Sequence, residues 1–99
     1  MKYDILIVGS GPGGYVSAIR AAQLGRRVAL VERAEAGGVC LNWGCIPTKA
    51  LLKSAQVYGY CRNAGHYGLE LTGEVRPDPE KIVARSRGVA ETMSKGVQF

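Results

Sequence analysis

The chain has 99 residues, 46% of them hydrophobic and 21% charged, which fits one small domain or part of a larger one. Lys and Arg exceed Asp and Glu by 13 to 8, and these basic residues are scattered, so nucleic-acid binding has no support. The apolar runs, such as residues 5–8, are too short for a membrane span or a signal peptide. We therefore expect a soluble, cytoplasmic protein that binds no membrane.

Residues 1–36 have the pattern of a βαβ unit. Apolar runs without alternation at residues 3–8 and 27–32 are typical of strands buried on both faces of a parallel sheet. Between them, residues 15–24 are predicted to form a helix, with Gly25 where a C-terminal glycine is expected. The predicted fold class is α/β, with a Rossmann-like nucleotide-binding unit.

The loop between the first strand and the helix contains a dinucleotide-binding pattern. Gly9, Gly11 and Gly14 form G-x-G-x-x-G, and Glu32 ends the second strand. In such a loop the first glycine permits a tight turn, the second lets the backbone approach a pyrophosphate, and the third lets helix and strand pack closely. Helix N-terminal amides would bind the phosphates, and Glu32 the ribose hydroxyls. The acid favours FAD or NAD over NADP, whose 2′-phosphate it would repel, and the alternative is a structural turn with chance glycines.

Two cysteines, Cys40 and Cys45, precede a helix predicted at residues 48–62. On an undistorted helix residues five apart have Cα atoms about 8.7 Å from each other, whereas a disulfide needs about 4.4–6.8 Å. A disulfide would therefore require a distorted turn, which Gly44 and Pro47 make feasible. A thiol near a helix N-terminus is partly ionised. The spacing leaves open either a redox pair or two unrelated structural thiols.

No metal site is predicted. A zinc site needs four ligands, and beyond the cysteine pair only Cys61 and His66 remain. We expect Cys61 to be an inert apolar residue near the end of the helix, and His66 a loop residue without a catalytic role.

The stretch from Gly37 to Leu52 resembles the redox-active segment of the FAD-dependent pyridine nucleotide–disulfide oxidoreductases, and the resemblance extends over residues 3–99. The continuation 47–52 is closer to the lipoamide branch than to glutathione or trypanothione reductases, with mercuric reductases as the further alternative. The resemblance implies that a parent protein oxidises protein-bound dihydrolipoamide through a Cys40–Cys45 disulfide and FAD to reduce NAD⁺. It also implies a homodimer and, as partner, the lipoyl domain of a 2-oxo acid dehydrogenase or glycine cleavage complex.

The same resemblance implies roles for individual residues. Cys40 matches the interchange thiol that meets the dithiol substrate, and Cys45 the thiol that contacts the flavin. Lys49 matches a lysine near the flavin that pairs with a glutamate from later in the chain. Trp43 stands where a small apolar residue is commoner, and Val39 where many relatives have Thr. The residues implied in FAD binding are Gly9, Gly11, Pro12, Gly13, Gly14, Glu32, Arg33, Gly38, Val39, Cys40 and Lys49.

Two features are expected in the second half of the chain beyond the cysteines. The redox helix carries an apolar stripe (Leu51, Leu52, Ala55, and Val57 or Tyr58) that we expect in the core. After a short strand at 69–71, Asp78 is a plausible N-cap and Pro79 the first residue of a helix to about residue 95. The apolar face of that helix is marked by Ile82, Val83, Ser86, Val89, Ala90, Met93 and Val97.

The expected organisation is one incomplete FAD-binding domain over residues 1–99. It comprises the βαβ unit (1–36), the redox segment and helix (37–63), and a loop with an amphipathic helix (64–99), without NAD and dimerisation domains. A doubly wound sheet has five or six parallel strands, whereas the sequence clearly predicts only two. One edge of the predicted sheet is therefore apolar and unpaired. We therefore expect an N-terminal fragment that is inactive by itself, with a non-catalytic FAD-binding or thiol-redox module as the other functional class.

Overall fold

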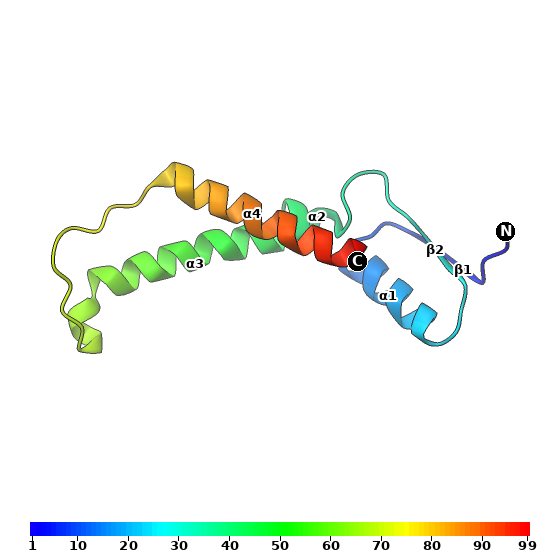
Figure 1. The fold of residues 1–99 in the computed structure, drawn as a ribbon, viewed down its shortest axis with the longest axis horizontal. Coiled ribbons are helices and arrows are strands. Elements are labelled where there is room, and N and C mark those ends of the chain that lie inside the picture. The colour runs from blue at the N-terminus through cyan, green and yellow to red at the C-terminus, as the bar shows by residue number, and fades with distance from the viewer.

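A computed structural model describes all 99 residues and begins with a parallel βαβ unit (Figure 1). It consists of β1 (Ile5–Val8), α1 (Pro12–Gln23) and β2 (Val28–Val31). The strands are parallel, with Ile5 opposite Val28 and Val8 opposite Val31. The predicted βαβ unit is therefore confirmed, although both strands are shorter than residues 3–8 and 27–32.

Helix α1 begins three residues earlier than predicted, inside the glycine motif. Pro12 is its first residue, because the fixed φ of proline suits that position and the missing N–H is not needed there. At the other end Gly25 has φ +79°, the left-handed conformation expected of a glycine that follows a helix.

The cysteine segment folds into two helices, where the sequence predicted only one that begins at residue 48. Helix α2 (Gly38–Asn42) contains Cys40, and Cys45 is the first residue of α3 (Cys45–Arg62). Gly44 separates the two helices, and a Cβ on it would lie 3.1 Å from the Val39 carbonyl oxygen. The distorted turn expected between the cysteines is present.

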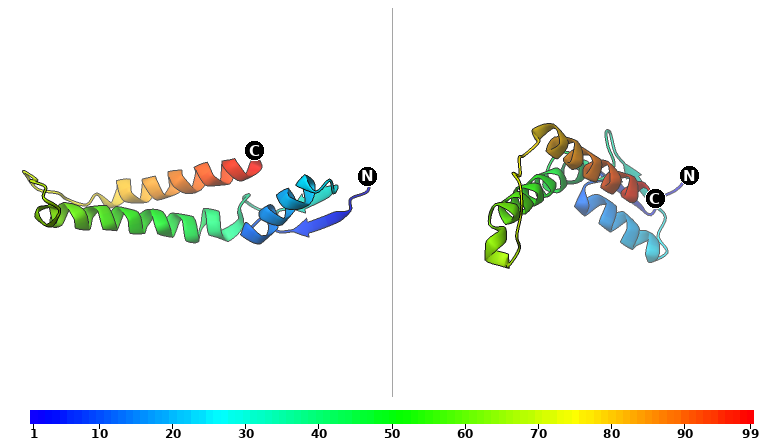
Figure 2. Two further views of the ribbon diagram at one scale, coloured as in Figure 1. Left: turned by 90° about the horizontal axis from the view of Figure 1, so that it is seen from below. Right: turned by 60° about the vertical axis from the view of Figure 1, so that its left-hand side comes forward.

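The last helix, α4 (Pro79–Gln98), follows the prediction. Its N-cap is Asp78, whose carboxylate accepts a hydrogen bond from the Lys81 amide at 3.2 Å. Figure 2 shows that α4 runs back alongside α3. A 3₁₀ helix, η1 (Ala64–Tyr67), follows α3 and includes His66. The prediction of a strand at 69–71 is wrong. This exposed stretch forms no strand, because no neighbouring strand pairs with it.

Small residues, and not the predicted apolar stripe, form the buried surface of α3 and α4. Leu51, Leu52 and Val57 are exposed, so placing this stripe in the core was wrong. The residues that are buried on these two helices are Pro47 and Ala50 on α3 and Ser86, Ala90 and Ser94 on α4. Spaced four apart, the residues on α4 lie on one helix face, and their small size allows a neighbouring backbone to come close.

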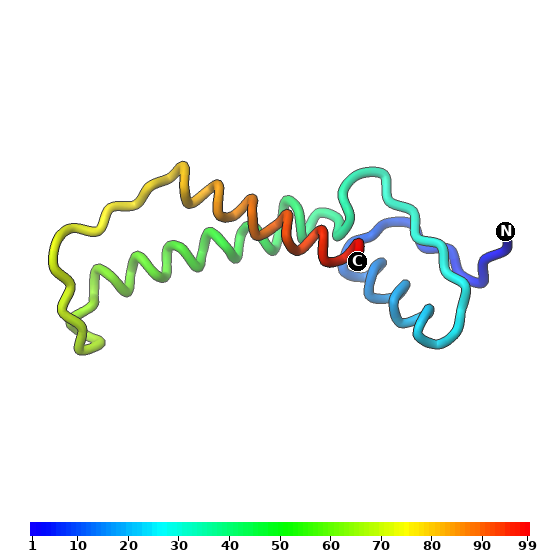
Figure 3. Tube along the Cα trace, viewed as in Figure 1, coloured from blue at the N-terminus to red at the C-terminus, as the bar shows by residue number.

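The molecule is elongated, with extents of 64 × 26 × 17 Å and a radius of gyration of 19.3 Å, against about 13 Å for a compact domain of this length. The trace in Figure 3 shows the βαβ unit at one end and the α3–α4 pair extending away from it. On β1 the side chains of Leu6 and Val8 are 64% and 82% exposed. Helix α1 packs against the two strands, so one face of the sheet is covered and the other is not, as we expect of an incomplete doubly wound domain. None of the helices combines the length and apolar character that a membrane span requires.

Candidate functional site

Ser10 ties the glycine loop to the end of β2, and its side chain is only 1% exposed. The Ser10 hydroxyl donates to Glu32 Oε2 at 2.6 Å, and the Ser10 amide donates to the same oxygen at 2.9 Å. The Ala34 amide donates to Glu32 Oε1 at 3.0 Å. These hydrogen bonds, that of the Ser10 hydroxyl first, lower the pKa of Glu32 to about 2. Glu32 is therefore a fixed carboxylate at neutral pH.

The three motif glycines have three different geometries. Gly9 has φ +99°, which permits the turn at the end of β1. A Cβ on Gly14 would lie 1.9 Å from the Gly9 carbonyl oxygen, whereas a Cβ on Gly11 would have no atom within 4 Å. The tight turn and the close packing of the helix agree with the sequence interpretation, and the backbone at Gly11 is open to an approaching group.

The N-terminus of α1 presents amides beside this open backbone. The first hydrogen bond of the helix runs from the Tyr15 amide to the Gly11 carbonyl oxygen at 3.0 Å. The amides of Gly13 and Gly14 lie before it and have no partner within the helix. Such donors, at the positive end of the helix dipole, suit the phosphates of a dinucleotide.

The cysteine segment is attached directly to the glycine loop. The Gly37 amide donates to the Ser10 hydroxyl oxygen at 3.2 Å, so Ser10 bonds both Glu32 and the chain leading to Cys40. Gly38 has φ +65°, and a Cβ on it would lie 2.8 Å from the Gly11 Cα. The loop that could hold a dinucleotide and the segment that carries the thiols therefore form one unit.

Cys40 and Cys45 are adjacent free thiols, the first half-buried and the second exposed. A hydrogen bond with Cys45 raises the pKa of Cys40, and burial and the charge of Cys45 act in the same direction. The Cys45 amide and the charge of Lys49 oppose this rise in the pKa of Cys40. The two sulfurs are thus within reach of each other, and the disulfide between them stays a prediction.

The other residues implied in cofactor binding are spread around the glycine loop and the cysteine pair. Val39 lies on α2 and is exposed, as is Arg33 in the loop after β2. Lys49 lies one turn after Cys45 on α3, is exposed, and takes part in none of the four ion pairs of the structure. No three His, Cys, Asp or Glu side chains are grouped as a metal site would require.

Residues that the sequence reasoning missed hold the cysteine segment from two sides. The Asn42 side chain, between the cysteines in sequence, donates to the carbonyl oxygens of Ala36 and Gly38 at 3.0 and 2.9 Å. From α4 the Ser94 hydroxyl donates to the Ala36 carbonyl oxygen at 2.7 Å, and Arg87 donates to the Asn42 carbonyl oxygen at 2.9 Å. The small residues spaced four apart on α4, Ser86, Ala90 and Ser94, were the one sign in the sequence that this helix face lies close to a neighbouring segment.

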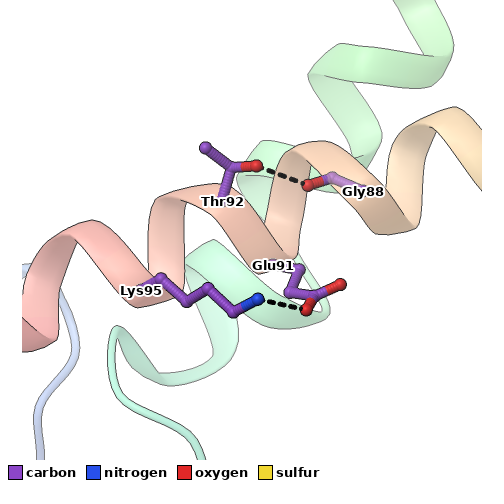
Figure 4. A network of polar contacts seen from close by, with 4 residues as sticks. All are labelled: Gly88, Glu91, Thr92 and Lys95. Carbon is purple, nitrogen blue, oxygen red and sulfur yellow. Dashed lines mark hydrogen bonds and ion pairs between the residues drawn. The ribbon is translucent and has the colours of Figure 1, made fainter.

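A polar cleft of about 380 Å³ opens where α4 passes the turn between the cysteines, and Trp43 and Arg87 both line it. Figure 4 shows two more of its lining residues, Glu91 and Lys95, which are joined at 2.6 Å. Thr92, on the same helix, donates to the Gly88 carbonyl oxygen at 3.0 Å. The pKa of Glu91 is lowered by Lys95, and the opposite charges along the cleft leave it without a strong preference for anions or cations.

The fold and the site together define a class: proteins in which a dinucleotide-binding βαβ unit is fused to a thiol pair at the start of a helix. The family model described as pyridine nucleotide-disulphide oxidoreductase matches residues 3–99. The chain belongs to this family, as the resemblance of residues 37–52 indicated.

Its relatives include several proteins named dihydrolipoyl dehydrogenase. Those of Rhizobium etli and Zymomonas mobilis are each 57% identical over 98 residues, which is 99% and 97% of this chain and 20% of each relative. The relative of Acholeplasma laidlawii is 53% identical over 98 residues, 99% of this chain and 29% of its own. These names agree with the lipoamide branch favoured from residues 47–52. The chain spans about a fifth of the length of the first two relatives, which is consistent with an incomplete domain.

Among solved structures, the chain is similar to the HOCl-induced flavoprotein disulfide reductase RclA of Escherichia coli, determined as a Cu(II) complex. The two are 29% identical with a TM-score of 0.71, and the match covers 95% of this chain and 18% of RclA. A flavoprotein disulfide reductase therefore contains the same arrangement of elements.

Proposed function

We propose that residues 1–99 supply the FAD-binding βαβ unit and the redox dithiol of a dihydrolipoyl dehydrogenase. The observation that carries the proposal is the Ser10 contact, which joins the nucleotide loop, the acid at the end of β2 and the cysteine segment in one hydrogen-bonded unit. An enzyme that passes electrons from a thiol pair to a bound flavin needs these parts to be adjacent. The relatives that are 57% identical carry the name of that enzyme.

The residues of the glycine loop fit the ADP half of FAD. The open backbone at Gly11 and the amides of Gly13 and Gly14 would bind the pyrophosphate. Each oxygen of the Glu32 carboxylate can accept more than one hydrogen bond, so Glu32 can bind ribose hydroxyls while it remains bonded to Ser10 and Ala34. When bound, FAD supplies a two-electron acceptor that a dithiol alone lacks.

The cysteine pair would carry the two electrons. In the oxidised state a thiolate of dihydrolipoamide attacks the Cys40 sulfur, the Cys40–Cys45 bond breaks, and Cys45 leaves as a thiolate. The second substrate thiol then attacks the mixed disulfide at the substrate sulfur and releases Cys40, which gives cyclic lipoamide and the reduced pair. Two electrons and two protons leave the substrate in these two exchanges.

The local electrostatics favour Cys40 as the thiol that meets the substrate and Cys45 as the thiol that contacts the flavin. The raised pKa of Cys40 favours the protonated thiol at that position, next to Cys45. Cys45 is exposed at the N-terminal end of α3, where the helix dipole stabilises a thiolate and where an acceptor ring can approach. Lys49, one turn further, adds a positive charge on the same side.

The parent protein, in this proposal, is a cytoplasmic homodimer. Its partner is the lipoyl domain of a 2-oxo acid dehydrogenase or glycine cleavage complex, and NAD⁺ takes the electrons from the flavin. The NAD site and the dimer contacts would lie in parts of the protein that correspond to the remaining four fifths of the relatives.

The proposal can be tested in a chimera in which this chain replaces the matching 98 residues of the Rhizobium etli protein. The chimera should bind FAD and reduce NAD⁺ with dihydrolipoamide, whereas the 99-residue chain alone should show no turnover. Cys40→Ser and Cys45→Ser should each lower turnover by more than about 1,000-fold, because either change removes a sulfur that must react.

Cys61→Ser is the matched control, since Cys61 is at the far end of α3 from the pair. It should keep the activity of the chimera, and alkylation with mass spectrometry should find a reducible Cys40–Cys45 bond that excludes Cys61. Retention of a tenth of the activity in Cys40→Ser, or a disulfide that includes Cys61, would contradict the proposal.

A further inference from the structure

One hydrogen bond joins helix α4 to the turn between the two cysteines, and a charged side chain donates it. Arg87 Nη1 donates to the Asn42 carbonyl oxygen at 2.9 Å. Asn42 is the last residue of the five-residue helix α2, so no later amide of that helix can reach its carbonyl oxygen. Arg87 satisfies this oxygen from a position 45 residues away in sequence.

The contact lies where the spacing of the two sulfurs is determined. Cys40 belongs to α2 and Cys45 begins α3, so only residues 41–44 connect them. Gly44 in this connection has no side chain to pack, and Trp43 is exposed. The amide of Trp43 bonds back to the Val39 carbonyl oxygen at 2.8 Å, within the α2 turn. The Gly44 carbonyl oxygen accepts from the Thr48 amide of α3 at 3.1 Å, and the Asn42 side chain donates to the Ala36 carbonyl oxygen at 3.0 Å. The hydrogen bond from Arg87 is the one that joins this connection to α4.

We propose that Arg87 is a positioning residue for the dithiol: through the Asn42 carbonyl oxygen it holds the turn in the conformation that keeps the Cys40 and Cys45 sulfurs next to each other. This inference rests on the proposed redox role of the pair. A turn held in place lowers the conformational entropy that disulfide formation must remove, so the disulfide forms more readily. Without the Arg87 bond the turn samples more conformations, and the equilibrium moves towards the dithiol.

The same helix provides a control for general packing effects. Arg85 lies two residues before Arg87, and its Nη1 donates to the Ala50 carbonyl oxygen, also at 2.9 Å. It donates to the Ser54 hydroxyl as well, at 3.3 Å. Arg85 therefore links α4 to the middle of α3 without touching the turn. If the arginines merely join two helices, replacing either should have the same effect on the cysteines.

The experiment uses the chimera described above, equilibrated without oxygen in buffers of reduced and oxidised glutathione. Oxidation transfers two electrons and two protons from the pair to glutathione disulfide, which forms the Cys40–Cys45 bond and two glutathione thiols. Alkylation followed by mass spectrometry gives the oxidised fraction, and this measurement needs no bound flavin. A failure of the proposed function appears separately, as missing FAD or missing turnover in the unsubstituted chimera.

Arg87→Met should shift the equilibrium constant towards the dithiol by about tenfold, which corresponds to a potential about 30 mV less negative. Arg85→Met should change it less than twofold. Arg87→Lys keeps a hydrogen-bond donor but lacks the planar guanidinium group, so it should shift the equilibrium constant in the same direction by less. If the Met variants do not fold, the oxidised fractions of Arg87→Lys and Arg85→Lys are compared instead. An unchanged equilibrium in the Arg87 variants, or an equal shift in the matched Arg85 variants, would overturn the inference.

Discussion

Replacing Gly14 by alanine should damage the βαβ unit, because a Cβ there has no space. The added carbon would lie 1.9 Å from the Gly9 carbonyl oxygen and 2.9 Å from the Gly9 carbonyl carbon. Both are backbone atoms, so no side chain can rotate away. Helix α1 must move by more than about 1 Å relative to the end of β1 before the contact becomes tolerable.

The size of the effect follows from a comparison with the neighbouring glycine. Overpacking of this kind costs about 1–3 kcal/mol, and contact with rigid backbone belongs at the upper end. Alanine also gains up to about 1 kcal/mol in helix propensity over glycine, which gives a net loss of about 2 kcal/mol for Gly14→Ala. Gly13→Ala has the same propensity gain, and its Cβ would meet no atom within 4 Å. The two variants should therefore differ by about 3 kcal/mol in the free energy of unfolding.

Thermal unfolding followed by circular dichroism measures this difference. For a chain of this length 1 kcal/mol corresponds to about 4–8 °C in Tm, so Gly14→Ala should unfold more than about 10 °C below Gly13→Ala. Equal midpoints for the two variants, or a Gly14→Ala protein more stable than the parent, would refute the close packing of α1 against the turn.

Three further outcomes are expected. Gly11→Val should fold normally, because a Cβ there meets no atom within 4 Å. The chimera that carries this change should nevertheless lack FAD, which absorbance at the flavin band would show. Full flavin content would be inconsistent with pyrophosphate binding at Gly11. The stability that Glu32 contributes is present above the unfolded-state pKa of about 4.3 and is lost as the pH falls towards the folded pKa of about 2. Ser10→Ala should raise the pKa of Glu32 in an NMR titration and move acid unfolding to higher pH, and an unchanged titration would exclude the hydroxyl as the main cause. Lys49→Met should raise the pKa of Cys40 further, because the charge of Lys49 now lowers it; the pH profile of thiol alkylation checks this, and a shift to lower pH would contradict it.

The elements whose signals are local in sequence were predictable. The glycine loop, the apolar strands and the acid of β2 gave the βαβ unit, and Asp78 followed by Pro79 gave the start of α4. The start of α1 was missed because Pro12 was counted with the loop, although proline is common at a first helical position. The position of Gly44 indicated a distorted turn, but not that the residues before it form a helix of their own.

The predictions that failed depended on neighbours. The stripe at Leu51 and Leu52 was expected in the core, but the surface that α3 shares with α4 is formed by small residues such as Ala50 and Ala90. A strand at 69–71 has the right composition, yet a strand requires a partner, and none is adjacent. The contact of Arg87 with the Asn42 carbonyl oxygen joins residues 45 apart, and no periodicity of either segment encodes such a pair.

The junction between the βαβ unit and the cysteine segment has a consequence for which substitutions the protein tolerates. Two adjacent glycines form it, with φ +95° at Gly37 and +65° at Gly38. A Cβ on Gly37 would lie 2.5 Å from the Leu41 side chain, and one on Gly38 would meet the backbone of Gly11. The angle between the nucleotide loop and the thiols is thus encoded in backbone dihedrals that other residues rarely adopt. Most exposed side chains of α3 and α4, Arg87 excepted, can therefore vary without turning the thiols, whereas a single methyl group at either glycine would reorient the cysteine segment relative to the βαβ unit.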